Sequence, residues 1–139
     1  MLTSLYNLDA PIPSMFTQEY RNNGIIKLLK YQDKFYPGKP VVANKTTKQS
    51  KDIESFISTF CEFQLADNDY MNLQVEARQQ KDNKDWFKAL SEEKVLKLIT
   101  YIIWTDKFVD GYFSTRISDG TIHELLMRLH TLQKPLPLS

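Results

Sequence analysis

The chain has 139 residues, a length typical of one domain. Hydrophobic residues make up 42% of it and charged residues 25%, a balance that is typical of a globular protein and excludes a disordered one. The 18 basic and 17 acidic side chains leave a net charge of +1, so the sequence lacks the broad positive charge that favours binding to nucleic acid.

One cysteine, Cys61, excludes an internal disulfide and with it a secreted fold built on disulfides. No segment reaches the ~18 consecutive apolar residues of a membrane span. The N-terminal residues lack the basic and apolar regions of a signal peptide. By elimination, we expect a soluble cytoplasmic protein without a membrane partner.

The chain divides into an arm, a domain and a tail. Residues 1–17 contain Pro11 and Pro13 and show no sustained period, so we expect an irregular N-terminal arm. A single helical domain is expected over residues 18–134, followed by a tail over residues 135–139.

Two helices are expected in the first half of the domain. The first begins at about Asn23 and is ended by Pro37, because proline cannot continue a helix. The second is capped by Ser50, and Cys61 on its border is expected to pack as a small hydrophobic residue. The apolar stripe of the second helix consists of Ile53, Phe56, Ile57, Phe60 and Phe63 or Gln64.

The loop between these helices, residues 37–49, holds Lys39, Lys45 and Lys48. It is either a basic contact patch or a solvated loop. We favour the solvated loop, because no aromatic residue stands among the lysines to stack on a base. The sequence thus argues against nucleic acid as a partner.

Residues 67–90 predict a frayed helix, a polar turn and a short helical turn that carries Trp86 and Phe87. The helix predicted over residues 92–106 is clearer. Ser91 is expected to cap it, and two glutamates in its first turn complement the helix dipole. Most residues from 95 to 104 are apolar, which predicts a helix surrounded on nearly all sides. We therefore expect an all-α fold, a compact bundle of five to six helices around this buried central helix.

Two Asp-Gly pairs, Asp110-Gly111 and Asp119-Gly120, follow the predicted central helix. We interpret each aspartate as a helix cap and each glycine as a turn residue, with Gly120 in the left-handed conformation. The alternative is a carboxylate pair for general acid–base catalysis. No histidine or further acidic cluster points to the same place, so we favour the caps.

The last predicted helix ends before Pro135. Glu124 and Arg128 stand four residues apart on its outer side, where a surface ion pair worth ~0.2–0.5 kcal/mol is expected. The apolar stripe of this helix consists of Ile122, Leu125, Leu126, Leu129 and Leu132.

A resemblance to a known family rests on a C-terminal signature. Its residues are Phe108, Asp110, Gly111, Gly120, Ile122, Leu125, Leu126, Arg128 and Leu129, which read F-x-D-G … G-x-I-x-x-L-L-x-R-L. This pattern resembles that of a small bacterial all-helical family catalogued only as a domain of unknown function. The resemblance covers about residues 90–132 and implies a compact helical fold, with no established activity or ligand.

Residues for catalysis or metal binding are not apparent. His123 and His130 stand seven residues apart, whereas metal-binding pairs on helices usually stand four apart. Cys61 has no neighbouring base that would activate it as a nucleophile. We therefore predict no catalytic residue, no metal site and no cofactor.

A recognition surface near the first Asp-Gly pair is one interpretation, because aromatic and arginine side chains are common in binding hot spots. Such a cleft would suit an acidic peptide or a small anionic ligand. Its candidate residues are Trp104, Lys107, Asp110, Tyr112 and Arg116. The alternative, which we favour, is structural: Arg116 pairs with Asp110 or Asp119 and ties two short helices together.

These observations favour a non-catalytic interaction or regulatory protein that binds another protein, such as a small inhibitor of the kind carried by mobile elements. A sensor of a small anionic metabolite or nucleotide is the first alternative. An enzyme with an acid–base carboxylate near Asp110 is the second.

Overall fold

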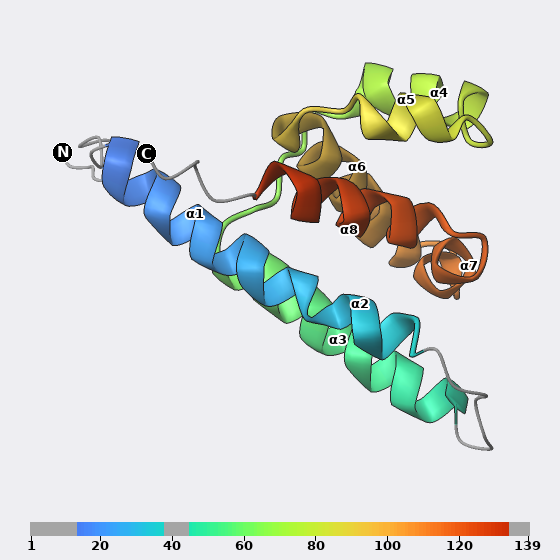
Figure 1. The fold of residues 1–139 in the computed structure, drawn as a ribbon. Helices are drawn as coiled ribbons and strands as arrows, with labels where there is room; N and C mark the ends of the chain where they lie inside the picture. The colour runs from blue at the N-terminus through green and yellow to red at the C-terminus, as the bar shows by residue number, and fades with distance from the viewer. Residues whose placement is uncertain (1–13, 38–44, 134–139) are drawn as a thin grey trace, which may run out of the picture.

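The computed structural model describes residues 14–37 and 45–133, and the regular structure of these residues is entirely helical (Figure 1). This confirms the predicted all-α class. The helices are α1 (Ser14–Leu29), α2 (Tyr31–Phe35), α3 (Lys45–Glu62), α4 (Met71–Gln79), α5 (Lys84–Lys88), α6 (Glu92–Asp106), α7 (Tyr112–Ser118) and α8 (Thr121–Leu132). None of the described helices is both long and apolar enough to cross a membrane.

Some of the predicted segments fall outside the described residues. These are most of the predicted arm, the centre of the lysine-rich loop 37–49 and the tail at 135–139. The last residues of that loop, from Lys45 onward, belong to α3. Ser50 therefore lies inside the helix and is not its cap, contrary to the prediction.

Helix α1 begins at Ser14, well before the predicted start at about Asn23. Tertiary hydrogen bonds hold the added turns in place. The Tyr20 hydroxyl donates to the carbonyl of Glu62 at 2.9 Å, and the Arg21 guanidinium donates to the carbonyl of Gln64 at 3.2 Å. These bonds fasten α1 to the end of α3, and contacts of this kind leave no local sequence pattern.

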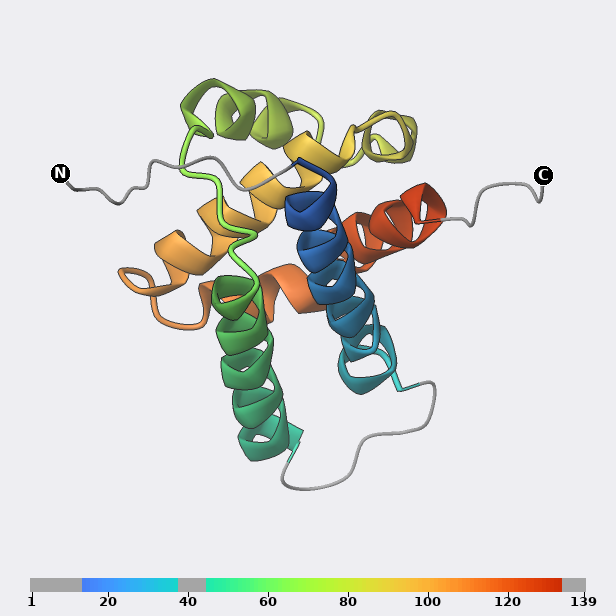
Figure 2. The same ribbon diagram turned by 90° about the vertical axis from the view of Figure 1, so that its left-hand side faces the viewer.

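Helices α1 and α3 lie side by side and antiparallel (Figures 1 and 2). A turn at Lys30 separates α1 from α2, which the sequence had predicted as one helix. Phe56 of α3 is fully buried and packs against Phe35 of α2 and Phe113 of α7, at ring-centre distances of 5.7 and 5.5 Å. Cys61 is exposed on α3, so its predicted packing as a core residue was wrong.

Helices α6 and α8 form the middle of the molecule, with α4 and α5 on the far side from α1 and α3 (Figure 1). As predicted, the Ser91 hydroxyl caps α6 by accepting a hydrogen bond from the backbone N–H of Lys94 at 3.2 Å. Helix α8 contacts α1, α5, α6 and α7, so it shares the central position with α6. The buried apolar residues of α6 are Val95, Leu96, Leu98, Ile99, Ile102 and Ile103.

Arg128 does not form the predicted surface pair with Glu124. Its Nε donates a hydrogen bond to the carbonyl of Leu90 at 2.7 Å, and the side chain is half-buried. Nearby, the Gln133 amide donates to a carboxylate oxygen of Glu92 at 3.1 Å. Both bonds join the end of α8 to the start of α6, because the fold brings these two helix ends together.

Candidate functional site

The α6–α7 corner, residues 104–111, is a tight turn with closed backbone hydrogen bonds. The N–H groups of Phe108 and Val109 both donate to the carbonyl of Thr105, at 3.0 and 2.8 Å. Gly111 has a φ of 79°, in the left-handed region that glycine adopts without strain. The corner therefore presents its side chains on a fixed backbone.

Asp106, rather than Asp110, caps α7. Its Oδ1 accepts a hydrogen bond from the backbone N–H of Phe113 at 2.9 Å. Asp110 is exposed and forms no hydrogen bond or ion pair with the residues that the structure describes. The prediction for Asp110 was wrong because the acceptor comes from the preceding helix, seven residues before its donor.

The second Asp-Gly pair matches the prediction in part, because the N-cap residue of α8 is Gly120 and not Asp119. Oδ1 of Asp119 accepts a hydrogen bond at 2.9 Å from the backbone N–H of Thr121, the first residue of α8. Gly120 has a φ of 89° and is left-handed, as expected. Oδ2 of Asp119 lies 3.1 Å from Nε of Arg116, which is one of the two structural pairings that the sequence suggested.

Three large apolar side chains of the α6–α7 corner are exposed to solvent. The exposed fractions are 85% for Phe108, 51% for Val109 and 38% for Trp104. The indole Nε1 of Trp104 donates to Oδ1 of Asn68 at 2.8 Å, and Nζ of Lys107 lies 4.3 Å from the centre of the Trp104 ring. The corner thus presents exposed aromatic side chains, which are enriched at the core of protein interfaces.

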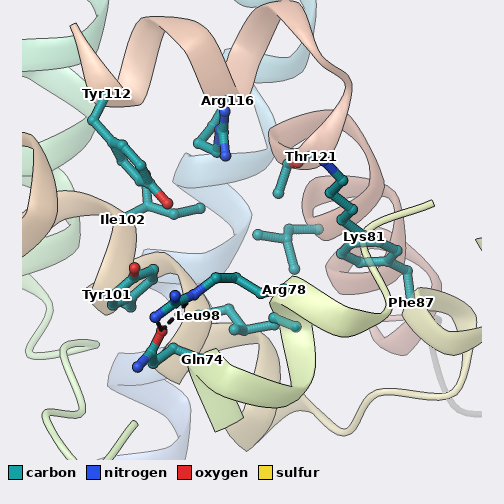
Figure 3. A pocket seen from close by; sticks show the side chains of 12 residues that line it. Gln74, Arg78, Lys81, Phe87, Leu98, Tyr101, Ile102, Tyr112, Arg116 and Thr121 are labelled. Atoms are coloured by element: carbon teal, nitrogen blue, oxygen red, sulfur yellow. Dashed lines mark hydrogen bonds between the residues drawn. The ribbon is translucent and has the colours of Figure 1, made fainter. Parts of the chain in front are cut away.

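A pocket lies between α4, α6, α7 and α8, and we call it the α4–α7 pocket (Figure 3). Its cavity volume is about 70 Å³. Its apolar lining residues are Ala77, Phe87, Leu98, Ile102 and Leu125. Its polar lining residues are Gln74, Arg78, Lys81, Tyr101, Tyr112, Arg116 and Thr121.

The structure divides the predicted cleft between these two places. Tyr112 and Arg116 line the α4–α7 pocket, toward which their side chains point in Figure 3. Trp104, Lys107 and Asp110 lie on the α6–α7 corner and do not line the pocket. The five predicted residues therefore do not form one cleft.

Tyr112 and Arg116 form the α7 wall of the pocket. The guanidinium carbon of Arg116 lies 4.8 Å from the centre of the Tyr112 ring. The Nε of Arg116 is buried and its N–H has no aligned hydrogen-bond acceptor among the described residues, although Asp119 is nearby. Burial is the main cause that raises the pKa of Tyr112, and a hydrogen bond with Tyr101 raises it further. Its hydroxyl is therefore protonated at neutral pH and able to donate.

The sequence matches the model of a family of unknown function, DUF6508, over residues 22–134. The chain belongs to this family. No curated protein and no solved structure matches it. The matched range contains residues 108–129, which carry the resemblance drawn from the sequence, as well as the corner and the pocket. A bacterial origin for this DUF6508 protein stays a prediction.

The histidines of the DUF6508 domain have different environments. Nδ1 of His123 lies 3.0 Å from the side-chain nitrogen of Gln32. The backbone N–H of His123 donates to the Tyr36 hydroxyl at 3.1 Å. His130 is exposed. Within residues 14–37 and 45–133, no group of three or more His, Cys, Asp or Glu side chains is placed to hold a metal ion.

Sequence reasoning missed the contribution of α4 to the pocket of this DUF6508 protein. Gln74 and Arg78 stand four residues apart, a spacing that places them on one helix face, and Lys81 follows in the next turn. That spacing was a usable signal. Phe108 was identified from the sequence only as a residue of the signature, and its exposure and that of Val109 appear only in the structure.

Proposed function

We propose that this protein is a non-catalytic binding protein whose α6–α7 corner contacts another protein. A small inhibitor of the kind carried by mobile elements is one form that such a protein takes. The observation that supports the proposal is Phe108, whose ring is 85% exposed on a turn with closed backbone hydrogen bonds.

The free energy of burial supports this role for Phe108. Full burial of a large apolar side chain contributes about 1.5–3 kcal/mol, and the folded chain alone leaves most of this unrealised at Phe108. A partner with an apolar pocket would gain it on binding. The fixed turn lowers the entropy lost in the complex, because little of the corner has to be ordered.

The neighbours of Phe108 indicate the chemistry of the partner. Val109 and Trp104 extend the apolar area on either side in the sequence. Lys107 holds a positive charge over the face of the Trp104 ring. We therefore expect an apolar pocket with at least one acidic residue at its rim, because charge complementarity of this kind favours specific contacts.

The geometry does not favour an enzyme with a catalytic Asp110. This carboxylate is exposed and lines no part of the α4–α7 pocket. The other aspartate of the predicted pair, Asp119, is held by Thr121 and Arg116. Structural roles account for the contacts of Asp119, and no residue that the structure describes forms a hydrogen bond or ion pair with Asp110.

Quantitative affinity purification tests the proposal, with the wild-type chain and Phe108→Ser as baits in cells that naturally produce the protein. We expect the recovery of at least one partner to fall tenfold or more with Phe108→Ser, which corresponds to about 1.4 kcal/mol or more of binding free energy. The melting temperature of the variant should stay unchanged, because this side chain is largely outside the core.

Met71→Ser is the matched control, since Met71 is 68% exposed on α4 and is not part of the corner. This variant should retain the partner. Equal recovery of every partner by Phe108→Ser would contradict the proposal. A wild-type dimer that Phe108→Ser dissociates would also contradict it, because the corner would then bind a second copy of the chain.

A further inference from the structure

The α4–α7 pocket is separate from the corner and has an unusual charge balance. Three cationic side chains line it, from Arg78, Lys81 and Arg116, and no aspartate or glutamate stands among its described lining residues. Its remaining polar residues include two tyrosines, Tyr101 and Tyr112, whose hydroxyls can donate hydrogen bonds.

The positive charges on the α4 side are not neutralised within the described part of the chain. Nε and a terminal nitrogen of Arg78 donate to Oε1 of Gln74, at 3.2 and 2.7 Å. An amide oxygen holds the guanidinium in one orientation but carries no charge to offset it. Neither Arg78 nor Lys81 forms an ion pair with a described residue.

Arg116 brings a third cation from the opposite wall. Figure 3 shows Arg116 and Tyr112 directed toward the pocket from α7, while Arg78 lies on the α4 side. Asp119 offsets part of the Arg116 charge at 3.1 Å, yet the buried N–H of Nε is not aligned with that carboxylate. A buried donor without an aligned acceptor is costly, and an anion near it would recover part of that cost.

The size of the pocket limits its ligand. A volume of about 70 Å³ holds roughly five to seven atoms of the size of a water molecule, at about 10–15 Å³ each. The apolar residues Leu98, Ile102 and Leu125 form part of the wall. An apolar body of about one six-membered ring therefore fills this volume, and the polar group of the ligand lies at the rim, beside the exposed Arg78 and Lys81.

We propose that the α4–α7 pocket binds a small organic anion, with an apolar body against Leu98 and Ile102 and a carboxylate between Arg78 and Arg116. Guanidinium groups suit a carboxylate, because their N–H groups match its two oxygens. This inference goes beyond protein binding at the α6–α7 corner, since none of the exposed apolar residues of the corner lines the pocket.

An NMR titration of the full ¹⁵N-labelled chain tests the inference at constant ionic strength. Benzoate serves as the anionic probe, benzamide as its neutral counterpart and inorganic phosphate as an anion without an apolar body. We expect saturable shifts in the backbone signals of Arg78, Tyr101 and Tyr112 with benzoate. Benzamide and phosphate should each bind at least tenfold more weakly.

Arg78→Gln and Lys81→Gln should each weaken benzoate binding by threefold to tenfold. Both residues are exposed, so the variants are expected to fold normally. Lys94→Gln is the matched control, because Lys94 is an exposed lysine on α6 that does not line the pocket. It should bind benzoate as the wild type does.

Four results would overturn the inference. They are the absence of saturable shifts with benzoate, shifts confined to residues outside the pocket, equal affinity for benzamide or phosphate, and unchanged benzoate affinity in both Arg78→Gln and Lys81→Gln. None of these results bears on Phe108, so failure of this inference and failure of the proposed function are distinguishable.

Discussion

Asp106 and Asp110 flank the same turn but differ in their contacts. Asp106 accepts a hydrogen bond from the N–H of Phe113. Asp110 is exposed and forms no hydrogen bond or ion pair with the residues that the structure describes. Loss of a helix-capping acceptor typically costs about 1 kcal/mol. We expect Asp106→Ala to lower the free energy of unfolding by about that amount, measured by urea denaturation.

Asp110→Ala is the matched control, and it should change the free energy of unfolding by less than about 0.5 kcal/mol. A loss with Asp110→Ala as large as that with Asp106→Ala would show that the cap is assigned to the wrong aspartate.

We expect the free energy of unfolding to depend on pH in the alkaline range because of Tyr36. Its hydroxyl donates to the carbonyl of Ile117 at 2.6 Å and accepts from the N–H of His123 at 3.1 Å. Burial is the main cause that raises its pKa well above the ordinary 10.0. Above pH 10 the unfolded chain loses a proton that the folded chain keeps. The free energy of unfolding should then fall, by at most about 1.4 kcal/mol per pH unit.

Tyr36→Phe separates this effect from general alkaline unfolding. At neutral pH the variant should be less stable by about 1–2 kcal/mol, because two partly buried backbone groups, at Ile117 and His123, each lose a hydrogen bond. Above pH 10 its stability should decline less steeply than that of the wild type. Tyr31→Phe, in the same helix region and half-buried, should keep the wild-type slope. Equal slopes for Tyr36→Phe and the wild type would rule out Tyr36 as the titrating group.

At the scale of elements, the α1–α3 pair depends on Gly24. A Cβ at this position would overlap the Cβ of Phe63 and lie 2.6 Å from its Cγ. The backbone holds the Phe63 Cβ in place, so the helices would have to separate. Alanine favours a helix over glycine by about 1 kcal/mol, but overpacking typically costs about 1–3 kcal/mol.

We therefore expect Gly24→Ala to reduce the melting temperature, as measured by circular dichroism. Asn23→Ala is its control on the exposed side of α1, and it should leave the melting temperature unchanged or slightly higher. A more stable Gly24→Ala would mean that α1 and α3 are not packed this closely.

The helices whose caps and apolar patterns lie within their own sequence were predictable. Helix α6 has a cap at Ser91 and a nearly continuous apolar run, and α8 has an apolar stripe after a left-handed glycine. The start of α1 was not predictable, because Tyr20 and Arg21 bond to backbone groups more than 40 residues away in the chain. The prediction for Arg128 was wrong for the same reason, since its acceptor at Leu90 lies 38 residues earlier, in the connection between α5 and α6.

At the scale of the whole molecule, the candidate site was predictable only in part. Tyr112 and Arg116 do line a pocket, but the α4 residues opposite them come from a segment that reads as a frayed helix. The sequence does not show that α4 packs on α6 and so forms the opposite wall of the pocket. The corner lies at a sequence position that the signature includes, yet only the structure shows how far Phe108 is exposed.

Hydroxyl-radical footprinting of the complex recovered with the wild-type chain tests the role of the α6–α7 corner most directly. Oxidation of Phe108 and Trp104 is compared between the free protein and the complex, with Met71 as the internal reference because it is exposed outside the corner. We predict strong protection of Phe108 and Trp104 and unchanged oxidation of Met71. Oxidation of Phe108 at the same rate in the complex as in the free protein would contradict the account.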